Sequence, residues 1–174
     1  VDYYNGGMEH ATRHLLYARF WHNFLYDQGL VPYNEPFKKR VAHGMMLCSN
    51  GEKMSKSKGN VVNPDDMIKS YGADALRCYE LFIGDYTADA SWSEDGLKGC
   101  KKFLDRIYRL GTKLNGNSEY TKEVEILINQ TIKKVTVDLD NMKDNNAVFA
   151  LMFFLNELGK LDTISNEDYR TLLH

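Results

Sequence analysis

The interpretation of this chain depends on one stretch, Gly51-Glu52-Lys53-Met54-Ser55-Lys56-Ser57-Lys58-Gly59-Asn60. Three lysines lie within six residues, separated by hydroxyl side chains and bracketed by glycines. Ammonium groups and backbone N–H groups on such a loop bind polyanions. The spacing does not match the G-x-x-x-x-G-K-[ST] pattern of nucleotide-binding P-loops. We therefore predict a mobile loop that clamps phosphates, and the alternative is a solvated basic turn.

The composition is that of a globular chain. Its 174 residues are 43% hydrophobic, which is enough to bury a core in one or two units. The net charge of -2 gives no overall attraction to nucleic acid, so any polyanion contact has to come from a local patch such as Lys38 to Lys58. No apolar run has the length of a membrane span, and no signal-peptide pattern opens the chain.

The cysteines and histidines argue against a zinc site. Cys48, Cys78 and Cys100 are too far apart for a C-x-x-C pair, and the five histidines are scattered. The odd number of cysteines argues against a disulfide framework. We expect a reducing, cytoplasmic location, no bound metal and a monomer. The chain opens at Val1 inside an apparent strand, so we expect a piece of a longer protein.

The opening residues predict a strand followed by a helix. Val1 to Asn5 are β-prone and Gly6-Gly7 end the run. The helix should have Glu9 near its start, and its apolar residues recur at i, i+4. They are Leu16, Phe20 and Phe24 in one row and Tyr17, Trp21 and Leu25 in the other. Gly29 and Pro32 should end it.

His10 and His14 are expected one turn apart on the same face of that helix. Two histidines at this spacing can bind a metal, but neither an H-E-x-x-H pattern nor a third ligand is present. Taken alone, the pattern favours polar groups satisfied within the structure.

The central region predicts a second strand and two short helices. Val41 to Leu47 are continuously apolar enough for a strand buried on both faces. Asn63-Pro64-Asp65-Asp66 is a strong helix start, with a capping Asn and Pro at the first helical position. Gly72 should end that helix, and Asp74 can cap the next.

From Ser93 onward the pattern is helical. Two apolar stripes are expected to form core, namely Leu97, Cys100, Leu104, Ile107 and Leu114, and Ile128, Ile132, Val135 and Leu139. Asp144-Asn145-Asn146 should cap a further helix that carries Phe149, Met152, Phe153 and Leu158. Three or more antiparallel helices with short loops make a bundle. The predicted fold class is mixed α/β, mostly α.

Three segments resemble class I aminoacyl-tRNA synthetases. Lys53-Met54-Ser55-Lys56-Ser57 is similar to the second signature sequence of that class. Tyr3-Tyr4-Asn5-Gly6-Gly7-Met8-Glu9-His10-Ala11, followed by His14 to Phe20, resembles the G-G-x-E-H segment of the leucyl enzymes, and Tyr71 to Arg77 is also similar to the family. The resemblance implies the C-terminal part of a Rossmann-like catalytic domain over residues 1–62, connecting stem-contact helices over 63–92, and an incomplete anticodon-binding bundle over 93–174.

The resemblance also implies roles for individual residues. Lys53 and Lys56 would be catalytic and hold the leaving phosphates. The ATP-binding residues would be Gly6, Gly7, Glu9, Met46, Leu47, Lys53, Met54, Ser55, Lys56 and Ser57, with Glu9 on the ribose and backbone atoms around Met46, Leu47 and Met54 on adenine. Tyr4, His10 and His14 would border the aminoacyl group.

By this resemblance the parent enzyme activates leucine with ATP and Mg²⁺ and transfers it to tRNA(Leu). No H-x-G-H stretch is present, so the chain alone is expected to be inactive. One alternative is an isoleucyl, valyl or methionyl enzyme, which Glu9-His10 after Gly6-Gly7 argues against. Another is a non-enzymatic helical RNA-binding module, which would bind phosphates without nucleotide preference. A third alternative is a purely structural helical protein, in which the pentapeptide Lys53 to Ser57 would have arisen by chance.

Overall fold

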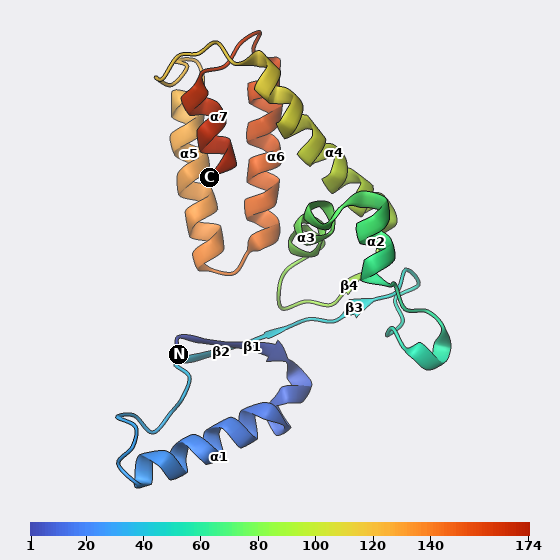
Figure 1. Ribbon diagram of the computed structural model, residues 1–174, viewed down its shortest axis with the longest axis vertical. Helices are drawn as coiled ribbons and strands as arrows, with labels where there is room; N and C mark the ends of the chain where they lie inside the picture. Colours follow the sequence, from blue (N-terminus) through green and yellow to red (C-terminus); the bar gives the residue numbers. More distant parts are fainter.

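The computed structural model describes residues 1–174, and its helices and strands follow one another along an elongated molecule (Figure 1). The first elements are β1 (Tyr3–Gly7), the 3-10 helix η1 (Met8–Thr12), α1 (His14–Asp27) and β2 (Lys39–His43). Then come β3 (Met46–Leu47), η2 (Lys56–Lys58), α2 (Pro64–Tyr71), α3 (Ala73–Phe82) and β4 (Ala90–Ser91). The last are α4 (Glu94–Leu110), η3 (Gly111–Lys113), α5 (Glu125–Asp140), α6 (Asp144–Lys160) and α7 (Asn166–Leu173). The mixed α/β, mostly α fold class is confirmed.

The strands form two parallel pairs. β1 pairs with β2 from Tyr3 opposite Lys39 to Gly7 opposite His43. β3 pairs with β4 through only two residues on each strand. A parallel pair joined by a helix is the expected β-α-β connection, and it brings the carboxyl ends of β1 and β2 to one edge.

The prediction of one buried strand over 41–47 was wrong. The run breaks at Gly44 into β2 and β3, which belong to different sheets, and β2 is only partly buried. The backbone at Ala88–Asp89 packs so closely on Gly44 that any side chain there would collide with it. Gly44 N–H donates to the Tyr86 carbonyl at 2.9 Å, and Met45 N–H donates to Asp89 Oδ1 at 2.6 Å. The loop from Tyr86 to Asp89 therefore takes the hydrogen bonds that would have continued the strand.

The prediction that His10 and His14 share a helix face was also wrong. Glu9 and His10 lie in η1, and α1 begins only at His14. Arg13, with φ -119° and ψ -104°, separates the two helices. Glu9 therefore lies on a tight turn between strand and helix. The apolar rows of α1 are largely exposed, including Leu16, Tyr17, Phe20, Trp21 and Phe24.

The helix start at Asn63 is confirmed, because its side chain accepts the Asp65 N–H at 3.2 Å. Gly72 ends α2 as predicted. The caps predicted at Asp74 and at Asp144 were wrong. Only Gly72 separates α2 from α3, so Asp74 already lies in the first turn of α3, and no side chain caps this end. Asp144 is the first residue of α6, where it too makes no capping hydrogen bond.

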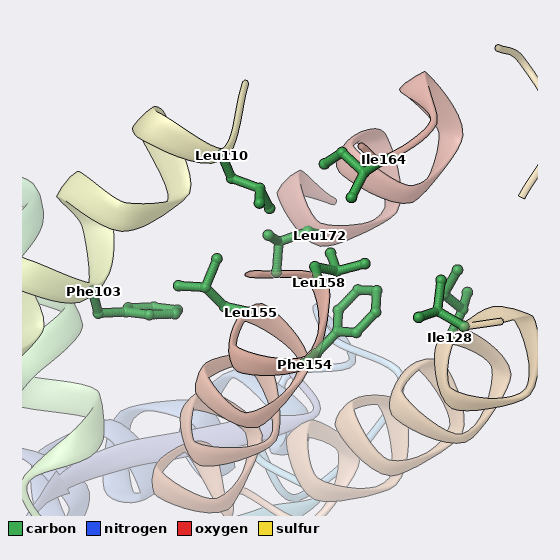
Figure 2. Packing of buried hydrophobic residues seen from close by; sticks show 9 residues of the cluster. Phe103, Leu110, Ile128, Phe154, Leu155, Leu158, Ile164 and Leu172 are labelled. Carbon is green, nitrogen blue, oxygen red and sulfur yellow. The ribbon is translucent and has the colours of Figure 1, made fainter. Parts of the chain in front are cut away.

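The main core lies where α4, α5, α6 and α7 meet (Figure 2). Its nine buried residues are Phe103, Leu110, Val124, Ile128, Phe154, Leu155, Leu158, Ile164 and Leu172. A second cluster joins α3 to the start of α4 and contains Ala75, Leu76, Tyr79, Leu97 and Cys100. Cys78, Leu104 and Met152 pack against both clusters, so α4 carries the core continuously from α3 into the bundle.

Part of the predicted core stripes is exposed, contrary to expectation. Ile132 and Leu139 on α5, and Phe149 and Phe153 on α6, are 45–64% exposed. The α7 helix has 8 residues against 16 in α5, so it covers only part of that helix. A groove of about 580 Å³ remains, lined by Ile132, Val135 and Leu139 together with residues of α6 and α7. No helix is at once long enough and apolar enough to span a membrane.

Candidate functional site

The predicted aminoacyl-binding residues lie in β1, in η1 and at the start of α1. The Tyr4 side chain, 8% exposed, packs on Phe37 with ring centroids 4.7 Å apart. Its hydroxyl is 3.0 Å from Nδ1 of His14, at the start of α1. His10 lies beside Gly6, where an added Cβ would be 3.9 Å from the His10 Cβ. The structure therefore brings Tyr4 and His14 into direct contact and places His10 against the backbone of the glycine turn.

Glu9 lies at the carboxyl end of β1. Its carboxyl group folds back over Gly7, where an added Cβ would be 2.7 Å from the Glu9 Cδ. A hydrogen bond from its own backbone N–H, opposed in part by desolvation, lowers the pKa of the Glu9 carboxyl below its usual value. The positive charges of His10, Lys53 and His43 lower this pKa further. Glu9 is therefore an ionised, solvent-exposed acceptor that can bind hydroxyl groups.

A tight turn connects β3 to the lysine loop. Cys48 N–H donates to the Glu52 carbonyl at 2.8 Å, and Gly51 N–H donates to the Cys48 carbonyl at 2.9 Å. Lys53 then pairs with Leu47 as an isolated antiparallel bridge. The turn therefore fixes the first lysine beside β3. The predicted adenine neighbours Met46, Leu47 and Met54 are all partly buried in this region.

Beyond the bridge, the chain forms the extended residue Ser55 and the 3-10 turn η2. Gly51 and Gly59 both adopt positive φ, at 82° and 66°, as expected for glycines that bracket a loop. The Ser55 and Ser57 hydroxyl oxygens are 2.8 Å apart. The two hydroxyls therefore hydrogen-bond to each other within the loop.

The three lysines differ in their electrostatic partners. Lys58 forms an ion pair with Glu52 at 3.2 Å. Neither Lys53 nor Lys56 forms an ion pair. Lys53 is close enough to Glu9 to lower the pKa of its carboxyl, whereas Lys56 is not among the charges that act on Glu9. The loop therefore offers two free ammonium groups, and Lys53 lies on the side of the β1 turn.

Sequence reasoning missed two residues near this site. His43 ends β2 directly opposite Gly7 and contributes to the field at Glu9. Its place could have been predicted, because the carboxyl ends of neighbouring parallel strands meet at one edge. Asn60, just after the loop, makes hydrogen bonds back into it. Asn side chains commonly bond to nearby backbone groups, so Asn60 also carried a signal.

A cavity of about 400 Å³ adjoins this region. It is lined by His43, Gly44, Met45 and Met46 on one side and by residues 80–90 on the other. The larger groove between α5, α6 and α7 contains none of the predicted site residues. No three His, Cys, Asp or Glu side chains converge in an arrangement that could hold a metal ion.

Comparison with known proteins identifies the family. Residues 17–93 match the model of class I tRNA synthetases (I, L, M and V). The chain is 54% identical over 173 residues to leucine–tRNA ligase of Alkaliphilus oremlandii (strain OhILAs), a match that covers 99% of this chain and 22% of that protein. The chain belongs to the class I tRNA synthetases. It is a homologue of leucine–tRNA ligase along almost its whole length, so this part of the sequence-based interpretation is confirmed.

A solved structure gives the same result. The chain superimposes with a TM-score of 0.86 and 33% identity on the ternary complex of Agrobacterium radiobacter K84 agnB2 LeuRS, tRNA and LeuAMS. That match covers 99% of this chain and 25% of the other. The chain therefore spans about a quarter or less of the length of these class I relatives.

Proposed function

We propose that this chain is the part of a leucine–tRNA ligase that supplies the phosphate-binding lysine loop and the ribose-binding turn for leucine activation. In this proposal residues 1–62 belong to the catalytic domain, 63–92 are connecting helices, and 93–174 belong to the bundle that binds tRNA(Leu). The observation that carries the proposal is the match to leucine–tRNA ligase along almost the whole chain, which includes both the Glu9 turn and the lysine loop. The positive charge of Lys53 also acts on the Glu9 carboxyl, which supports a common site for the class I lysine signature and the leucyl-type turn.

The arrangement suits the chemistry of amino-acid activation. The leucine carboxylate attacks the α-phosphorus of ATP in line, and pyrophosphate leaves, so negative charge develops on the departing phosphates. Groups that bind those oxygens more tightly in the transition state accelerate the step, whereas uniform binding of ATP would not. Lys53 and Lys56 carry unpaired ammonium groups on a loop between two positive-φ glycines. We assign them to the leaving phosphates.

The remaining ATP contacts follow from the turn and the adjoining strand. Glu9 is an ionised acceptor for the ribose hydroxyls, and Gly6 and Gly7 let the backbone approach the sugar. Backbone atoms at Met46, Leu47 and Met54 would bind adenine. Mg²⁺ enters this proposal only with the ATP phosphates, because the chain has no cluster of metal-ligating side chains.

Leucine is assigned to the pocket edge formed by Tyr4, His10 and His14. The hydrogen bond between Tyr4 and His14 gives that edge a fixed shape, and shape is how a pocket selects a branched aliphatic side chain. The chain alone should not catalyse the reaction, because the H-x-G-H half of the ATP clamp is not in its sequence.

Pyrophosphate exchange tests the proposal. The full-length protein should exchange labelled pyrophosphate into ATP when leucine is present, and far more slowly with isoleucine, valine or methionine. A preference for one of those three amino acids would indicate a different class Ia enzyme. Binding of tRNA without any amino-acid-dependent exchange would support the non-enzymatic RNA-binding alternative.

A further inference from the structure

Asn60 connects the end of the lysine loop to its beginning. Its Oδ1 accepts the Ser55 N–H at 2.8 Å. Its Nδ2 donates to the Lys53 carbonyl at 3.4 Å and to the Cys48 sulfur at 3.5 Å. Since one backbone partner is a donor and the other an acceptor, they define which way the amide points.

This side chain contacts the backbone on both sides of Met54. The turn before the loop is held in a similar way, because Asn50 Oδ1 accepts the Glu52 N–H at 3.0 Å and the Cys48 S–H at 2.6 Å. Cys48 is 7% exposed and lies between the two asparagines. Asn60 itself is partly buried, and its hydrogen bond with the Ser55 N–H is partly shielded from competing water.

We propose that Asn60 is a positioning residue for amino-acid activation, which holds Lys53 and Lys56 in the arrangement that receives the leaving phosphates. This inference rests on the proposed function. Asn60 acts through the loop backbone, because its contacts are to backbone groups and to Cys48. Without them the glycine-bracketed loop samples conformations in which the ammonium groups are misplaced, and only a fraction of the molecules can react.

Hydrogen exchange at the Ser55 amide tests the contact itself and does not depend on activity. In the full-length protein, Asn60→Ala should speed exchange at Ser55 about tenfold, which is the effect of losing roughly one net hydrogen bond. Asn60→Asp keeps an acceptor for Ser55 N–H and should restore most of the protection. Asn63→Ala is the matched control, because Asn63 caps α2 and does not contact the loop. It should leave Ser55 unchanged.

Kinetics in the full-length protein test the positioning role. Asn60→Ala should lower kcat for leucine-dependent pyrophosphate exchange about tenfold, with less than a twofold change in the KM for leucine. Asn63→Ala should leave kcat nearly unchanged. If the loss of kcat came only from reduced folding stability, it should appear in both variants, because each substitution removes a side chain that makes hydrogen bonds. It would then follow the amount of folded protein.

Three outcomes would overturn the inference. They are unchanged Ser55 exchange in Asn60→Ala, unchanged kcat in that variant, and an equal loss of kcat in Asn63→Ala. Failure of the proposed function looks different, because the unsubstituted full-length protein would then show no leucine-dependent exchange at all. That result would also overturn the inference, because Asn60 cannot position groups for a reaction that the protein does not catalyse. The Ser55 measurement would still show whether the hydrogen bond from Ser55 to Asn60 exists.

Discussion

The hydroxyl of Tyr4 lies 3.0 Å from Nδ1 of His14, and the two rings are nearly parallel, with an interplanar angle of 6°. The contact joins the middle of β1 to the first residue of α1 across the η1 turn. Because Tyr4 is buried against Phe37, it fixes the position of His14 and not the reverse. The edge assigned to leucine therefore has one rigid member, Tyr4, and one replaceable member, His14.

We predict that His14→Gly in the full-length protein relaxes amino-acid selectivity. Removing the imidazole enlarges the pocket edge, and one methylene of shape discrimination is worth only about 1–3 kcal/mol. Amino acids bulkier than leucine should therefore gain roughly tenfold or more in kcat/KM relative to leucine. Steady-state pyrophosphate exchange with leucine and larger analogues measures this ratio.

Glu9→Gln is the control for that experiment. Glu9 lies at the opposite end of the η1 turn from His14, and its charge is assigned to the ribose. Its loss should raise the KM for ATP and leave the order of amino-acid preference intact. If His14→Gly instead raised the KM for ATP and preserved selectivity, the two ends of the turn would be wrongly assigned.

Several elements that local chemistry determines were predicted from the sequence, although the caps expected at Asp74 and Asp144 were not formed. Asn63 caps α2, Gly72 ends it, and the lysine loop is bracketed by positive-φ glycines. The break at Gly44 could not be read locally, because the backbone that packs on it comes from Ala88 and Asp89. Hydrophobic spacing also marks an apolar face without indicating what covers it. For this reason it did not distinguish Ile128, which is buried, from Ile132 four residues later, which is exposed.

At the candidate site, too, local sequence motifs were informative and contacts between distant segments were not predicted. The motif resemblance selected Glu9 and Lys53. In the structure the positive charge of Lys53 acts on the Glu9 carboxyl and contributes to its lowered pKa. The resemblance gave no information on His43 or Asn60, because their positions follow from strand pairing and from loop hydrogen bonds. The roles assigned to the lysines, Glu9 and His14 therefore stay predictions that need kinetic tests.

A second prediction concerns the thiols of Cys78 on α3 and Cys100 on α4. The hydrogen bond from Cys100 lowers the pKa of Cys78 below its ordinary value of 9.0, although burial opposes the shift. The same hydrogen bond, together with burial, raises the pKa of Cys100. A thiolate is the reactive form, so alkylation of Cys78 should reach its half-maximal rate below pH 9, and Cys100 should react last.

Substitutions at Cys100 test the cause of this shift. Cys100→Ser keeps a donor and should leave the pH profile of Cys78 alkylation nearly unchanged. Cys100→Ala removes the donor and should move that profile to higher pH. The measurement is the rate of iodoacetamide labelling of the Cys78 peptide, followed by mass spectrometry between pH 6 and 10. Identical profiles in the two variants would show that the hydrogen bond does not set the pKa.

A third prediction concerns the stability of the bundle. Asp168 is completely buried and accepts hydrogen bonds from Thr121 N–H at 3.1 Å, Thr121 Oγ1 at 2.5 Å and Ser165 N–H at 2.9 Å. Ser165 Oγ in turn accepts the Asp168 N–H, which completes a capping box at the start of α7. One carboxylate therefore fixes both the helix start and the loop before α5.

Asp168→Asn should destabilise the chain by about 2–3 kcal/mol, because an amide offers one acceptor oxygen to three donors and turns an N–H group toward them. Urea unfolding monitored by circular dichroism measures the change. Asp162→Asn is the matched control, since Asp162 is exposed and makes no hydrogen bond or ion pair, and it should shift stability by less than about 0.5 kcal/mol. Equal midpoints for the two variants would contradict the assigned role of Asp168.

The last prediction compares Lys56 with Lys58 in the full-length protein. The residues are two positions apart in η2, but Lys58 is paired with Glu52 and Lys56 has no carboxylate partner. A charge that acts mainly on the departing pyrophosphate contributes more to the transition state than to ground-state ATP binding. By analogy with the loss of an oxyanion donor, Lys56→Ala should lower kcat by roughly two to three orders of magnitude, with a smaller change in the KM for ATP.

Lys58→Ala should change kcat by no more than about twofold, because an exposed ion pair contributes little and its charge is already engaged. The pair of variants removes the same side chain from the same turn, so a general loss of basic charge would affect both alike. Pyrophosphate exchange at saturating leucine, with ATP varied, gives kcat and KM separately. A raised KM for ATP with unchanged kcat in Lys56→Ala would assign this lysine to ATP binding in the ground state, and the transition-state role proposed for it would be wrong.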